Sequence, residues 1–164
     1  MKGPFELMRL ASVVVPLILV TPSIARGQDS TFDAMQQRGK VAMGVDQYSS
    51  FHQFVSAADG GRIVLVRDSL DAAGVETIRD HLKGIAQAFT AGNFQTPGFV
   101  HDQTVPGTQM MTAKKAAIRY VFHPLPGGGE VRIVTRDAAA VTAVHQFLTF
   151  QATEHRTNTP GHQH

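Results

Sequence analysis

Hydrophobic and polar positions change period several times along the chain, and each change predicts an element. Two β-rich runs within residues 51–67 flank the turn Asp59-Gly60-Gly61, which is typical of a hairpin. From Asp71 to Phe89, apolar residues recur at spacings of three and four. This pattern predicts an amphipathic helix that ends before Gly92, so the segment has the order strand, strand, helix.

The same plan returns in the second half of the chain. Residues 118–122 and 131–135 flank a Pro- and Gly-rich turn, and helical spacing follows from Val141 to Gln151. A shift of 68 positions aligns the two hairpins, and dropping two loop residues then aligns the two helices. We predict a duplicated ββα unit in an α+β fold, with a four-stranded antiparallel sheet and two long helices packed on one face. The alternative is that two hairpin-plus-helix segments align by chance.

The remaining segments complete the predicted organisation. Residues 47–155 form a single domain, preceded by an N-terminal segment at 26–46 that is partly disordered but contains a short helix at 31–38, ended by Gly39. A flexible tail follows at 156–164. Residues 94–117 form an insert between the two units, with a short helix near 110–115. Long connections in compact domains often carry binding sites.

The N-terminus has the features of a cleavable signal peptide. Lys2 and Arg9 precede an apolar run at 10–20, and small residues lead up to Ala25, after which we predict cleavage. A retained membrane anchor is the weaker alternative, because the run is about half of the roughly 20 residues that span a bilayer. We therefore expect a periplasmic or secreted protein without a membrane anchor after cleavage. The chain has no cysteine, which excludes a disulfide framework and a lipid attached to an N-terminal cysteine.

Composition and motifs argue against several function classes. The formal net charge is +2, the basic residues are scattered, and aromatic residues make up 7% with no tryptophan, so no nucleic-acid surface is expected. The chain lacks a Gly-x-Ser-x-Gly elbow, a phosphate-binding glycine loop and a His-Glu-x-x-His pair. A metal-dependent enzyme would need a base beside an open coordination position, and no base can be nominated. We favour a role other than catalysis.

Histidine is the unusual residue of this chain. It occurs eight times. His81 and His145 fall on the apolar sides of the two predicted long helices, and His52 alternates in phase with Phe54 on its strand. His101 lies in an apolar part of the insert.

Histidine and methionine side chains together predict a transition-metal site. Neutral imidazole binds copper, zinc, iron and nickel, and thioether sulfur adds a preference for cuprous copper. We predict copper, with zinc next, in a metal-handling rather than catalytic role. The alternative for each histidine is a half-buried packing residue whose ring nitrogens bond to the backbone. The predicted ligands are His52, His81, His101 and His145, with Met110 and His155 as further candidates.

Several of these residues belong to a wider pattern. The pattern comprises Met43-Gly44-x-Asp46-Gln47, His52-x-Phe54, His81-Leu82, His101 and His145-x-Phe147-Leu148-x-Phe150-Gln151-x-x-x-His155. It resembles an uncharacterised family of small exported bacterial proteins. The similarity spans most of the chain after the signal peptide and implies no activity, fold or ligand.

A second function class remains open. Val64 and Val66 alternate with Ile63 and Leu65, so the first hairpin has apolar residues on both faces. One face must be covered by something else. The alternative function is therefore a structural or interaction module that binds another envelope protein or forms a homodimer.

Overall fold

The computed structural model describes residues 24–44 and 49–157. The predicted signal peptide lies almost entirely outside this part of the chain, as does most of the predicted tail. The elements are α1 (Ile24–Met43), β1 (Ser50–Ala57), β2 (Gly60–Arg67), α2 (Ala72–Thr90), α3 (Gln95–His101), α4 (Thr108–Ala113), the short 3-10 helix η2 (Lys115–Ala117), β3 (Ile118–Leu125), β4 (Gly128–Thr135) and α5 (Ala138–Glu154).

The four strands form one antiparallel sheet in the order β1-β2-β4-β3. The two central strands pair with Ile63 opposite Val131, which places apolar side chains on the same face. Gly60 is required where the strands come close, because its φ is +131° and a Cβ there would lie 2.4 Å from the carbonyl oxygen of Ile133. The predicted α+β fold with a four-stranded antiparallel sheet is confirmed.

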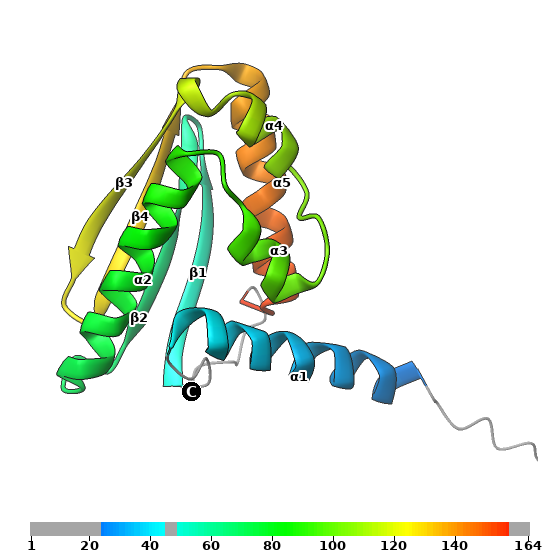
Figure 1. Cartoon of the computed structure of the whole chain (residues 1–164), viewed down its shortest axis with the longest axis vertical. Helices are drawn as coiled ribbons and strands as arrows, with labels where there is room; N and C mark the ends of the chain where they lie inside the picture. Colours follow the sequence, from blue (N-terminus) through cyan, green and yellow to red (C-terminus); the bar gives the residue numbers. More distant parts are fainter. Residues whose placement is uncertain (1–23, 45–48, 158–164) are drawn as a thin grey trace, which may run out of the picture.

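Two long helices pack against this sheet and complete the hydrophobic core (Figure 1). Each begins at an aspartate whose side chain accepts a hydrogen bond from a backbone amide three residues later, Asp71 in α2 and Asp137 in α5. Helix α2 packs over β2, β3 and β4, and α5 packs over β1, β2 and β4. Their apolar stripes bury residues such as Ile78 and Val144, both 0% exposed, against the sheet.

The insert between the units contains two helices, of which the sequence predicted one. Helix α4 lies close to the predicted helix at 110–115, whereas α3 was not expected because Pro97 and Gly98 interrupt the pattern. Pro97 lies in the first turn of α3, where backbone amides have no intrahelical partner, so a proline is tolerated there.

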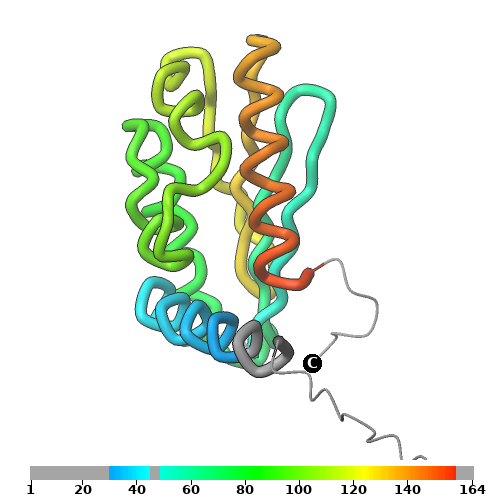
Figure 2. The backbone as a smooth tube through the Cα atoms, turned by 90° about the vertical axis from the view of Figure 1, so that its right-hand side faces the viewer, coloured from blue at the N-terminus to red at the C-terminus, as the bar shows by residue number. Residues whose placement is uncertain are grey.

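The N-terminal helix α1 is longer than the sequence predicted. The helix does not end at Gly39 as expected but runs without a break to Met43. Tertiary packing explains the difference: Met35 and Met43 are 3% and 8% exposed, and Arg38 Nε donates to the carbonyl of Val100 over 2.8 Å. Figures 1 and 2 show α1 lying across one end of the helices and sheet. Within the described residues, no helix is long and apolar enough to cross a membrane.

Candidate functional site

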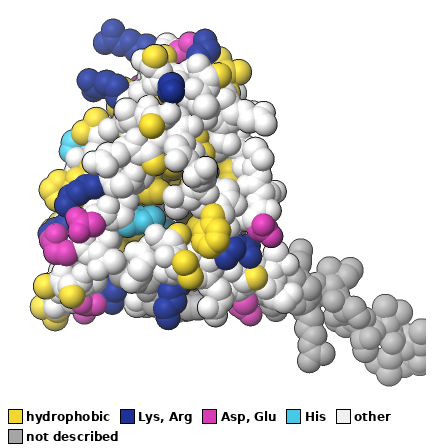
Figure 3. Space-filling model, in the orientation of Figure 1, with side chains coloured by type: hydrophobic (Ala, Val, Ile, Leu, Met, Phe, Trp, Pro, Cys, Tyr) yellow, Lys and Arg dark blue, Asp and Glu magenta, His cyan; other side chains and the backbone are white. Residues whose placement is uncertain are grey.

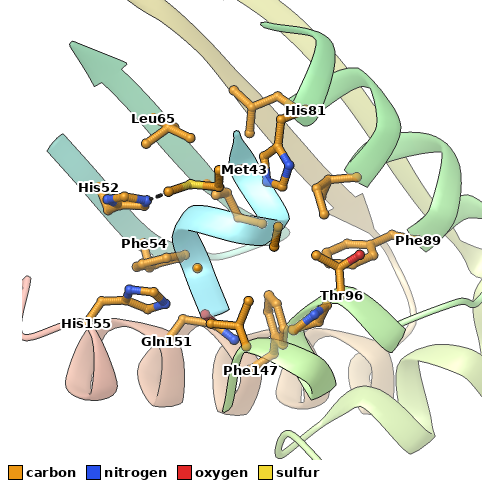
Figure 4. A pocket seen from close by; sticks show the side chains of 17 residues that line it. Met43, His52, Phe54, Leu65, His81, Phe89, Thr96, Phe147, Gln151 and His155 are labelled. Carbon is orange, nitrogen blue, oxygen red and sulfur yellow. Dashed lines mark hydrogen bonds between the residues drawn. The ribbon is translucent and has the colours of Figure 1, made fainter. Parts of the chain in front are cut away.

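A cavity of about 90 Å³ lies where the C-terminal end of α1 meets β1, β2, α2, α3 and α5 (Figure 4). Aromatic and aliphatic side chains form most of its wall, and three histidines, a glutamine and a threonine add polar atoms. None of its described lining residues is Asp, Glu, Lys or Arg. On the face drawn in Figure 3, a histidine and hydrophobic side chains reach the surface near the centre, while charged side chains gather along the left side.

Met43 and His52 contact each other in the wall of this cavity. Met43 is the last residue of α1, and β1 directs His52 toward the same interior as Phe54. The thioether sulfur of Met43 lies 3.3 Å from Nε2 of His52 (Figure 4). A soft sulfur donor and an imidazole nitrogen are therefore within contact distance at a partly buried position.

His155 joins this pair from the end of α5. It follows the last helical residue, and its backbone N–H donates to the carbonyl of Gln151 over 3.0 Å. Its ring stacks on that of His52, with 5.4 Å between centroids and 16° between planes. Phe54 lies against the same ring at 5.4 Å. The C-terminal end of α5 thus brings a second imidazole next to the first.

His101 and Gln151 lie behind His155. His101 is the last residue of α3 and is 7% exposed, and its ring is perpendicular to that of His155 at 5.2 Å. Its Nε2 lies 3.1 Å from Oε1 of Gln151. Within the described part of the chain, Nδ1 of His101 and Nε2 of Gln151 have no hydrogen-bond partner. Buried polar atoms without partners are unusual in folded proteins and call for an explanation.

Burial keeps this group of histidines neutral at pH 7. It lowers the pKa of His52 to about 4, with a further contribution from the charge of His81. Burial also lowers the pKa of His155 well below its usual value, and His52 and His101 add to this effect. The pKa of His101 is lowered mainly by burial, although the hydrogen bond to Gln151 opposes the shift. Neutral imidazole is the form that binds metals.

His81 enters the same cavity from α2, on the side opposite His155 (Figure 4). Burial lowers its pKa, and a backbone hydrogen bond with Ala42 acts in the opposite direction. This bond links His81 to the last turn of α1, a common role for a basic side chain at a helix C-terminus. His81 is therefore part of the cavity wall and also holds the helix that carries Met43.

Two of the predicted ligands lie elsewhere. Nε2 of His145 lies 2.9 Å from the carbonyl oxygen of Ala57, so its ring contacts the end of the β1–β2 hairpin and does not line the cavity. Met110 is 43% exposed on α4, whereas the neighbouring Met111 is the buried residue of that helix. His145 therefore matches the alternative given in the sequence analysis, a packing residue whose ring nitrogen bonds to the backbone.

Sequence reasoning did not nominate Met43 or Gln151 as site residues. Both belong to the pattern quoted for the resemblance, but no periodicity relates the end of α1 to a strand or to α5.

In the described residues, no group of three or more His, Cys, Asp or Glu side chains is arranged to hold a metal ion. Comparison with known proteins finds no match to a family model, to a curated protein or to a solved structure.

Proposed function

We propose that this chain is an exported protein that binds a transition-metal ion, copper rather than zinc, and that it handles the metal rather than catalysing a reaction. One observation carries the proposal. The sulfur of Met43 and Nε2 of His52 lie 3.3 Å apart in an uncharged cavity, and a second neutral imidazole, His155, stacks on the first.

The donor types favour cuprous copper. Thioether ligands select Cu(I), and imidazole binds copper readily. Zinc lies about 2.0–2.1 Å from an imidazole nitrogen and about 2.3 Å from a thiolate sulfur, so two such ligands of one ion are about 3.6 Å apart at a tetrahedral angle and farther apart at wider angles. The observed separation of 3.3 Å is shorter, so Met43 moves away from His52 when an ion binds between the two atoms.

The absence of a ready-made cluster of His and carboxylate ligands in the described residues fits copper better than zinc. Structural zinc sites use four ligands drawn from Cys, His and carboxylates. Cuprous copper accepts fewer ligands, and Met43 and His52 bring two suitable donor atoms into contact, with the ring of His155 stacked on that of His52. The uncharged lining of the cavity also favours a monovalent over a divalent cation, because the cost of burying charge rises with the charge.

Matched substitutions test the proposal. The untagged protein is titrated with Cu(I) under anaerobic conditions against a chromophoric chelator, and bound metal is counted by mass spectrometry. Met43→Leu and His52→Gln should each weaken Cu(I) binding by more than about 100-fold, since even the loss of residues that only support a ligand costs about 10–100-fold.

The controls make the same substitutions outside the cavity. Met110→Leu and His123→Gln change exposed residues and should bind Cu(I) as the unmodified protein does. A protein that takes up no copper, or one in which Met43→Leu and Met110→Leu bind equally well, contradicts the proposal.

A second candidate function uses the other face of the sheet. Phe51 is 45% exposed on β1, and Val55, Val66 and Val121 are only half-buried. These residues alternate with the inward-facing set and favour an interaction module that pairs with itself or with an envelope protein. Light scattering on the purified protein tests self-association: a dimer that Phe51→Lys dissociates supports it, and a monomer at all concentrations contradicts pairing with itself.

We also propose that the two ββα units arose by duplication and pack both long helices on one face of the sheet. Ser50 and Ile118 begin the first strands, Gly60 and Gly128 begin the second strands, and each pair is 68 positions apart. The two helices start 66 positions apart and share the aspartate cap. Each helix packs over the hairpin of the other unit, as a two-fold arrangement requires.

A further inference from the structure

We propose that the cavity beside the metal admits a small neutral molecule of two or three heavy atoms, which binds the metal through one atom and accepts a hydrogen bond from Gln151. Dioxygen, nitric oxide and carbon monoxide belong to this chemical class. The inference rests on the proposed function, because the metal supplies the first attachment point.

The size of the cavity is the first support. A buried metal ion needs little space beyond its ligands, yet the cavity measures about 90 Å³. For comparison, a cavity that holds a single water has a volume of about 10–15 Å³, and an apolar cavity of about 150 Å³ holds benzene. The space therefore exceeds what an ion needs and is sufficient for a molecule of two or three heavy atoms.

The lining selects a neutral molecule. Phe89, Phe147, Leu82 and Ile85 form much of the apolar wall, and none of the described lining residues carries a formal charge. Burial of an anion such as chloride or a carboxylate in this environment would be costly. A small neutral molecule enters without that cost.

Gln151 supplies the second attachment point. It is 4% exposed and lines the cavity on the same side as His155 and Phe147, the other α5 residues there (Figure 4). Its Oε1 is occupied by His101, whereas its Nε2 has no hydrogen-bond partner in the described residues. A buried donor left unpaired is destabilising by itself, and a ligand that accepts its hydrogen bond removes that penalty.

Carbon monoxide is the probe for this proposal, because it binds Cu(I) and reports its surroundings by infrared absorption. The Cu(I)-loaded protein is exposed to carbon monoxide, and both bound copper and the C–O stretching band are measured. We expect one carbon monoxide per copper. In Gln151→Met, which keeps the volume but lacks the donor, the band should shift to higher wavenumber and carbon monoxide should dissociate faster.

A space-filling variant tests the cavity itself. Ile85→Phe should keep copper and lose carbon monoxide, and thermal unfolding of the copper-loaded variant checks that it is folded. Copper binding without carbon monoxide binding in the unmodified protein overturns this inference and leaves the proposed function standing. Carbon monoxide binding with an unshifted band in Gln151→Met overturns it as well. A protein that binds no copper overturns both proposals.

Discussion

Under the proposed duplication, two contacts between a helix and an edge strand correspond to each other but differ in chemistry, and each joins the helix of one unit to a strand of the other. In one, Phe89 of α2 meets Tyr120 of β3 with ring centroids 5.6 Å apart. In the other, His155 at the end of α5 meets His52 of β1 at 5.4 Å. The strand offset of 68 relates Tyr120 to His52, and the helix offset of 66 relates Phe89 to His155.

The comparison shows that the packing geometry does not require histidine. A phenylalanine and a tyrosine fill the corresponding contact, so neutral imidazoles at His52 and His155 add chemistry rather than shape. Only the histidine contact is joined by Met43 from α1. The two contacts therefore differ in that only the histidine contact presents imidazole nitrogens next to a thioether sulfur.

The largest expected effect is a difference in how much each contact contributes to the free energy of unfolding. Phe89→Ala removes a side chain that is 2% exposed and should lower the free energy of unfolding by about 3–5 kcal/mol. His155→Ala should cost less, because burial of its imidazole is opposed by desolvation. Urea unfolding of the metal-free proteins measures both. Equal losses would show that the histidine contact is as important for the core as the aromatic one.

Acid should weaken the histidine contact selectively. The unfolded chain binds a proton at His52 near pH 6.5, whereas burial lowers the pKa of this residue in the folded protein to about 4. The folded state therefore binds fewer protons between these values, and stability falls as the pH falls. We expect a loss of about 2–3 kcal/mol from His52 between about pH 7 and about pH 4.5.

The matched control for this prediction is His52→Phe, which makes the position aromatic and non-titrating like its counterpart. Its urea unfolding should lose less stability over the same pH range, while the carboxylates contribute equally to both proteins. An identical pH dependence in the two proteins would show that His52 does not cause the loss.

The aspartate caps test how far the two units remain equivalent. Asp71→Ala and Asp137→Ala each remove a side-chain acceptor from the first turn of a long helix. Each should lower the melting temperature by roughly 3–6 °C. Thermal unfolding followed by circular dichroism measures the change. A loss confined to one variant would show that the helices contribute unequally to the stability of the fold.

The smallest effect concerns Tyr120, the counterpart of His52. Its hydroxyl is buried and has no partner among the described residues, and burial raises its pKa above the usual value. Tyr120→Phe should leave the free energy of unfolding unchanged or raise it by about 1 kcal/mol. A clear loss of stability in urea unfolding would show that the hydroxyl has a partner in solution.

Much of the fold could be predicted because its signals are local. Apolar spacing located α2 and α5, and glycines at the turns located both hairpins. Helix α3 was missed because Pro97 interrupts the pattern, although a proline in the first turn is compatible with a helix. The length of α1 was missed because packing of Met35 and Met43, rather than helix propensity, extends it past Gly39.

The candidate site was predictable only in part. The inward direction of His52 followed from its phase with Phe54, that of His81 followed from its place on the apolar side of its helix, and both residues line the cavity. The same argument placed His145 with them, but its ring reaches the carbonyl of Ala57 at the other end of the domain. Periodicity gives the direction of a side chain and not its position along the helix.

The sequence by itself determined the two hairpins, the two long helices, the turns within the hairpins and the inward face of these elements, because such features depend on neighbours within a few residues. Only the tertiary structure decided that the ends of α1, α3 and α5 meet beside β1. This arrangement brings together four residues from separate parts of the chain: Met43, His52, His101 and His155. No local pattern encodes such a meeting, because it results from how the whole core packs.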